Sequence, residues 1–133
     1  RSQWGGIFFY GIHQIDMVCR LLGQDVTHAQ INRGRKKVHT ATLYSAGGAV
    51  STLNLIAEGR PAFHVSVIGE KGRVDHTISY DENPYLSGIR SFCRVFRTGK
   101  TDETDRSILM PVAVLEALEK SIQQKKRVKV PSV

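Results

Sequence analysis

The chain has 133 residues, of which 41% are hydrophobic and 23% are charged, and its formal net charge is +7. This length suits one domain with a real core, and the composition excludes a disordered or fibrous chain. No stretch approaches the roughly 18 uninterrupted apolar residues of a membrane span, and no charged-then-apolar start marks a signal peptide, so we expect no membrane partner.

The first predicted element is a helix that ends at Leu22, before the natural helix stop Gly23. Its apolar side chains recur at spacings of three and four and so form one stripe, which consists of Ile12, Ile15, Val18, Cys19 and Leu22. A glycine-containing entry, residues 5–11, precedes this pattern. Polar residues fall on another side of the helix: His13, Asp16 and Arg20.

A period of two follows and predicts strands at residues 26–33, 38–45, 49–57, 62–68 and 73–80. The connections between them are short and rich in glycine, which forces neighbouring strands to run antiparallel. We therefore expect a five-strand meander. The central strand is mildly apolar on both sides, so we expect helices on one face of the sheet and another partner on the other.

Helical spacing returns at residues 84–99 and 107–126, and a short strand at 127–130 can join the edge of the sheet. The predicted fold class is α+β: a predominantly antiparallel open sheet, made of the five-strand meander plus the short C-terminal strand, with helices packed on one face.

Several function classes lack their motifs. No G-x-G-x-x-G opens a helix after a strand, and P-loop, H-E-x-x-H and C-x-x-C patterns are absent. The basic runs at 33–37 and 125–127 have no interleaved aromatic residues, and we interpret them as solvated turns rather than a nucleic-acid site. Four histidines on different strands have no metal-like spacing, so we expect no metal site; they are His28, His39, His64 and His76.

The two cysteines, Cys19 and Cys93, each sit in an apolar helical pattern. One possible pair does not make a disulfide framework, and such residues are usually small buried hydrophobic groups. A reducing, cytoplasmic setting is therefore expected. The chain opens on Arg1 rather than on methionine, so we also expect it to be one piece of a longer protein.

His13 and Asp16 form the most reactive combination in the sequence. An i,i+3 pair on a helix places a carboxylate within reach of an imidazole. The carboxylate can then orient the ring and favour its protonated form, as general acid–base catalysis requires. A pair that only stabilises the start of a helix would have the same spacing.

Residues 5–16 with Leu21-Leu22-Gly23 resemble the glycine-rich G-x-H-x-x-D segment of Gfo/Idh/MocA oxidoreductases. Later segments resemble that family in order: the hairpin Gly69-Glu70-Lys71-Gly72, the helix end from Phe92 to Lys100, and the closing helix and strand. The resemblance implies that residues 1–133 are a single C-terminal domain for substrate binding and oligomerisation, without the N-terminal Rossmann domain.

The same resemblance implies an NAD(P)-dependent oxidoreductase acting on a sugar, polyol or related hydroxy compound. NAD or NADP would bind in the full-length protein and not in this fragment, and homo-oligomers would form through the open sheet face. His13 would be the catalytic or substrate-orienting histidine and Asp16 its partner, while Tyr10 and Gly11 would contact the substrate.

Phe9 departs from the family pattern, which often has an aspartate four residues before the histidine. A phenyl ring cannot hydrogen-bond a substrate hydroxyl. A second hypothesis therefore stays open, in which the chain is a non-catalytic sensor or scaffold module derived from the same family.

Overall fold

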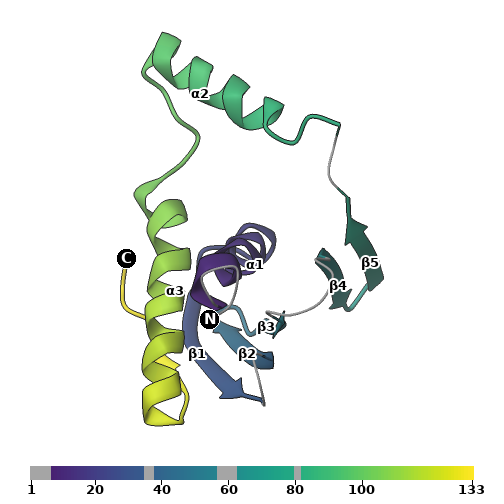
Figure 1. Ribbon diagram of the computed structural model, residues 1–133, viewed down its shortest axis with the longest axis vertical. Coiled ribbons are helices and arrows are strands. Elements are labelled where there is room, and N and C mark those ends of the chain that lie inside the picture. Colours follow the sequence, from purple (N-terminus) through teal and green to yellow (C-terminus); the bar gives the residue numbers. More distant parts are fainter. Residues whose placement is uncertain (1–6, 35–37, 57–62, 80–81) are drawn as a thin grey trace. The chain divides into compact units, whose positions relative to one another are not determined.

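The computed structural model describes residues 7–34, 38–56, 63–79 and 82–133 (Figure 1). These residues form two compact units. The main unit holds the described residues of 1–58 and 103–133, and the second unit holds those of 59–102.

The main unit is a four-stranded sheet with two helices on one face. It contains α1 (Ile7–Leu22), β1 (Val26–Arg33), β2 (Val38–Ser45), β3 (Val50–Ile56), α3 (Asp105–Gln124) and the short strand β6 (Val128–Lys129). The strands lie in the order β3–β2–β1–β6, and every neighbouring pair is antiparallel. Helix α3 packs along β1, while α1 packs on α3 and on β3 (Figure 1).

The core lies between the two helices and the sheet. Alternate strand residues point to one face, and helical residues three or four apart form the matching stripe, so apolar side chains meet there. The buried set includes Ile15, Cys19, Ala29, Ile31, Ala41, Leu43, Leu53, Leu55, Val114, Ala117 and Leu118. On the other face of the sheet, which α1 and α3 do not cover, Val50 and Ile56 of β3 are 60% and 61% exposed.

Local sequence signals fix the ends of both helices. Helix α1 stops before Gly23, whose φ of 95° is a conformation that favours glycine. Helix α3 begins with a capping box, in which Thr104 Oγ1 accepts the backbone N–H of Ser107 and Ser107 Oγ accepts that of Thr104. Lys125 follows the last turn of α3 in the left-handed region, with φ of 53°.

The second unit consists of a β-hairpin and one helix. Strands β4 (Phe63–Gly69) and β5 (Gly72–Ile78) pair antiparallel with each other through a tight turn. Helix α2 (Leu86–Thr98) ends at Gly99, which adopts the left-handed conformation at φ of 63°. Phe92 and Phe96 share one side of α2, with ring centroids 4.6 Å apart.

The α+β class, the antiparallel pairing and helices on one face of the sheet are confirmed. The five predicted strands, however, lie in two sheets: β1, β2 and β3 form a meander with β6, and β4 pairs with β5. Alternating hydrophobicity tells which face of a strand is buried but not which strand is its neighbour. The predicted turn at residues 59–61 lies outside the described residues.

Helix α1 begins at Ile7, earlier than its apolar stripe predicted, so that His13 lies within the helix rather than near its start. A stripe that begins at Ile12 marks only the turns that contact the core, whereas the backbone hydrogen bonds continue beyond it. Among the described residues, no helix is both long and apolar enough to cross a bilayer.

Candidate functional site

His13 lies on the solvent side of α1 and is exposed. The helix turns its fully buried stripe, Ile15 and Cys19, toward the sheet, and this leaves the imidazole free of the core. Its described ring neighbour is Tyr10, one turn earlier, with ring centroids 6.0 Å apart and planes tilted by 54°. The structure therefore presents His13 as an accessible group.

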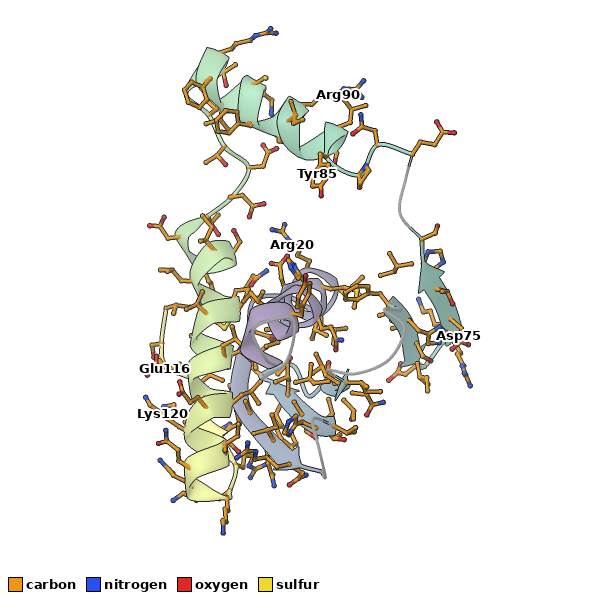
Figure 2. All side chains as sticks on the ribbon, viewed as in Figure 1. Arg20, Asp75, Tyr85, Arg90, Glu116 and Lys120 are labelled. Carbon is orange, nitrogen blue, oxygen red and sulfur yellow. The ribbon has the colours of Figure 1, made fainter. Side chains whose placement is uncertain are left out.

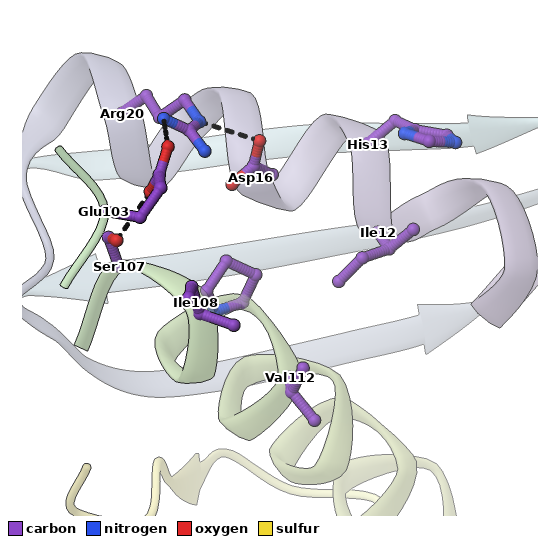
Figure 3. Close-up of a pocket in the computed structure, with 9 residues that line it drawn as sticks. Ile12, His13, Asp16, Arg20, Glu103, Ser107, Ile108 and Val112 are labelled. Atoms are coloured by element: carbon purple, nitrogen blue, oxygen red, sulfur yellow. Dashed lines mark hydrogen bonds and ion pairs between the residues drawn. The ribbon is translucent and has the colours of Figure 1, made fainter. Parts of the chain in front are cut away.

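Asp16 lies one turn further along the same side of α1, as the spacing predicts, but its carboxylate is directed away from His13 (Figure 3). Asp16 Oδ2 accepts a hydrogen bond from Arg20 Nε at 2.9 Å, which closes an i,i+4 ion pair. In the described part of the chain, no hydrogen bond joins Asp16 to His13.

Arg20 connects α1 to the start of α3. Its Nη1 donates to Glu103 Oε1 at 3.1 Å, and Glu103 Oε2 accepts from the hydroxyl of Ser107 at 2.7 Å (Figure 3). The Ser107 hydroxyl and then the Arg20 guanidinium hold the pKa of the Glu103 carboxyl below its usual value. The result is a continuous polar chain from Asp16 to the N-terminal turn of α3.

A groove of about 420 Å³ runs between α1 and α3 within the main unit (Figure 3). His13 lines it together with the polar chain described above. The remaining lining is apolar and comes from both helices: Ile12, Ile108, Pro111 and Val112. The groove is open to solvent, and its lining, mostly apolar with a few polar groups, has the composition that sites for small organic molecules share.

The other two predicted substrate residues differ in their exposure. Tyr10 lies beside His13 and is 42% exposed. Gly11 is buried inside α1 and faces β3, where a Cβ built on it would lie 3.7 Å from Leu55 Cδ2. Gly5 and Gly6 lie outside the described residues, as does the side chain of Phe9.

The sequence interpretation did not single out Glu103 and Ser107, because they lie in and after a loop that is distant from His13 in the sequence. Thr104 followed by Asp105 is a helix-start signal, which would have predicted an earlier start of α3 and so placed Glu103 next to that start. Arg20 was visible at four residues from Asp16, which is the better spacing for an ion pair on a helix.

The other histidines and the cysteines form no metal site within the described residues. His64, on β4, has Asp75 and Thr77 of β5 beside it. The described residues contain no group of three His, Cys, Asp or Glu side chains that could hold a metal ion. Both cysteines are free; burial, followed by the charges of Asp16 and Asp25, raises the pKa of Cys19 to about 11, whereas Cys93 is exposed. A thiol with so high a pKa is a poor nucleophile.

The sequence matches no family model and no curated protein. Solved structures, however, share its fold. GenD2 from gentamicin A biosynthesis, in complex with NAD, superimposes with a TM-score of 0.82 at 16% identity, over 96% of this chain and 49% of that one. The WlbA dehydrogenase of Bordetella pertussis, in complex with NADH and UDP-GlcNAcA, gives 0.74 at 20% identity, over 97% and 46%.

A scyllo-inositol dehydrogenase of Lactobacillus casei, with bound NAD(H) and scyllo-inositol, gives a TM-score of 0.64 at 16% identity, over 96% of this chain and 49% of that one. These neighbours are Gfo/Idh/MocA-type NAD(P)-dependent oxidoreductases. The chain spans about half the length of each. It therefore has the fold of one half of a Gfo/Idh/MocA-type oxidoreductase, consistent with the C-terminal domain.

Proposed function

We propose that the chain is the C-terminal substrate-binding and oligomerisation domain of an NAD(P)-dependent oxidoreductase acting on a sugar, polyol or related hydroxy compound. One observation carries the proposal: an exposed imidazole, His13, lines an apolar groove in a fold shared with dehydrogenases. The neighbour crystallised with scyllo-inositol supports the hydroxy-compound class.

His13 would act as the proton relay of the reaction. A hydroxyl that becomes a carbonyl must lose its proton, and an imidazole nitrogen within hydrogen-bond distance can accept it and return it in the reverse direction. Tyr10, beside the ring, would form one side of the substrate site. Asp16 would lie behind, fixed by Arg20.

The pairing of the described strands bears on where a dinucleotide cofactor would bind. Every pair of described strands is antiparallel, whereas the pyrophosphate site of a dinucleotide is built at a helix N-terminus within a parallel βαβ unit. We assign NAD or NADP to the other half of the full-length protein. This chain would contribute substrate contacts and proton transfer.

The open face of the sheet would form the interface between copies of the protein. Val50 and Ile56 of β3 and Val38 of β2 are large exposed apolar side chains, and α1 and α3 cover the opposite face. Val38 lies opposite Ile56 at one end of this face and Val50 lies opposite Tyr44 at the other. Exposed apolar side chains of this kind commonly take part in protein–protein contacts. The two free cysteines support a cytoplasmic location.

The proposal is tested with the full-length protein, NAD or NADP, and a panel of sugars and polyols. We expect reduction of the cofactor by at least one hydroxy compound, followed by absorbance of the reduced nicotinamide. In parallel, calorimetry on the 133-residue chain should detect no micromolar binding of either cofactor. A full-length protein that binds the panel compounds without oxidising them would favour the sensor or scaffold hypothesis instead.

A further inference from the structure

The carboxylate of Asp16 has two basic neighbours on its own helix. His13 precedes it by three residues and Arg20 follows it by four, and side chains at both spacings are within reach. The structure assigns the carboxylate to Arg20, at 2.9 Å. His13 therefore keeps its two ring nitrogens available for other partners.

Arg20 is itself held from the opposite side. Glu103 binds its Nη1, and Glu103 is in turn anchored to the hydroxyl of Ser107 at the first turn of α3. An isolated exposed ion pair of this kind contributes little, because two long side chains must be ordered in water. Here four side chains restrain one another, two on α1, one on α3 and Glu103 just before α3, so that the orientation of Asp16 is coupled to the packing of α1 on α3.

We propose that Arg20 is a positioning residue for His13: the Arg20–Glu103 pair holds Asp16 away from the imidazole and so leaves the ring free to bind a substrate hydroxyl. The effect of Arg20 on catalysis rests on the proposed function. The effect of Arg20 on the orientation of Asp16 concerns this chain alone. Without Arg20, the Asp16 carboxylate would turn to a ring N–H of His13, which precedes it by three residues, and fix one tautomer of the imidazole.

The test is the ¹⁵N spectrum of the histidine rings in the 133-residue chain, recorded at alkaline pH, where imidazoles are neutral. The His13→Gln variant identifies the His13 signals. In Arg20→Met we expect those signals to move toward a single, hydrogen-bonded tautomer. Adding Asp16→Ala should reverse the change, and Arg20→Lys, which keeps the cation, should show the wild-type spectrum.

Lys120→Met is the matched control. Lys120 pairs with Glu116 at the same i,i+4 spacing on the outer side of α3, away from α1 (Figure 2). It should leave the His13 signals unchanged. If Arg20→Met unfolds the chain, Glu103→Gln replaces it as the test variant. It weakens the Arg20–Glu103 pair and should shift the His13 signals in the same direction by a smaller amount. A His13 spectrum that responds to neither Arg20→Met nor Glu103→Gln would overturn the proposal.

Turnover separates this inference from the proposed function. In the active full-length protein, Arg20→Met should lower kcat by roughly tenfold, because the Asp16 carboxylate then competes with the substrate hydroxyl for the imidazole while the proton-transfer group remains, and Arg20→Lys should restore it. If the spectrum responds but His13→Asn leaves turnover intact, the proposed function fails and the control of His13 by Arg20 stands. If the spectrum does not respond, the inference fails whatever the turnover.

Discussion

The hydroxyl of Ser121 on α3 accepts the backbone N–H of Ile31 on β1 at 3.1 Å and donates to the carbonyl oxygen of Lys126 at 2.6 Å. Ser121 is fully buried. Strand β6 pairs only with His28 and Ala29, so it does not reach the N–H of Ile31. The Ser121 side chain therefore gives the Ile31 N–H, beyond the end of β6, a hydrogen-bond acceptor. It also connects the end of α3 to β1.

Replacing Ser121 with alanine should lower the free energy of unfolding by about 1–3 kcal/mol, because a buried N–H loses its only described acceptor. Urea unfolding measures the change. Ser132→Ala, on an exposed residue of the same unit, is the control and should unfold like the wild type. Coincident curves for all three proteins would show that the Ser121 bridge contributes nothing.

His39 makes stability depend on pH. Its side chain is buried, and Nδ1 has no hydrogen-bond partner among the described residues. Burial, followed by the positive charge of Arg33, lowers the pKa of His39 below 6.5. The unfolded chain therefore takes up a proton that the folded chain resists, so stability falls as the pH drops below about 6.5 toward the lowered pKa.

His39→Leu removes this proton uptake. From about pH 7 to about pH 5, its free energy of unfolding should fall by less than that of the wild type. Unfolding in urea at several pH values gives both slopes. Equal slopes for the two proteins would assign the acid sensitivity to other groups.

Gly11→Ala distinguishes a structural glycine from a substrate contact. The position is helical, and the new Cβ would lie at an ordinary contact distance, 3.7 Å, from Leu55. Alanine in a helix interior should therefore raise stability by roughly 0.5–1 kcal/mol. If the full-length protein is active as proposed, an unchanged KM would show that Gly11 serves packing, whereas a raised KM would support the predicted substrate contact.

Val50→Lys tests the open sheet face as the interface between copies. A charge on this exposed apolar position of β3 should shift the chain toward monomer in sedimentation velocity. Leu109→Lys is the matched control, because Leu109 is a comparably exposed apolar residue, 48% against 60%, on helix α3. A wild-type chain that is strictly monomeric at high concentration would contradict this assignment, as would a Leu109 variant that dissociates equally.

The sequence predicted the bounds of helices and strands closely where turn residues or helix-stop residues flank them. The bounds of β1 and β2 agree to the residue, because both are flanked by turn residues, although only β2 alternates regularly and the register of β1 shifts between Val26 and His28. The start of α3 was missed by two residues, since its capping box lies outside the apolar stripe. Strand pairing beyond β3 depends on tertiary contacts that alternation does not encode.

The candidate site was predictable only in part. The sequence identified the exposed side of α1, and His13 and Asp16 do lie along it. Spacing alone could not decide whether Asp16 binds His13 or Arg20. That choice depends on Glu103, which is distant in the sequence and lies beside Arg20 only because α3 packs on α1. Such long-range support of a site appears only once the helices are packed.

The central claim is that His13 transfers the proton of an alcohol–ketone interconversion. The measurement that tests it most directly is the steady-state turnover of the full-length His13→Asn protein with its hydroxy substrate, with cofactor binding measured alongside. We predict unchanged cofactor affinity and a kcat lowered by about 10²–10⁴-fold, the usual contribution of general acid–base catalysis. Turnover equal to that of the wild type would contradict the claim and reduce His13 to a surface residue of α1.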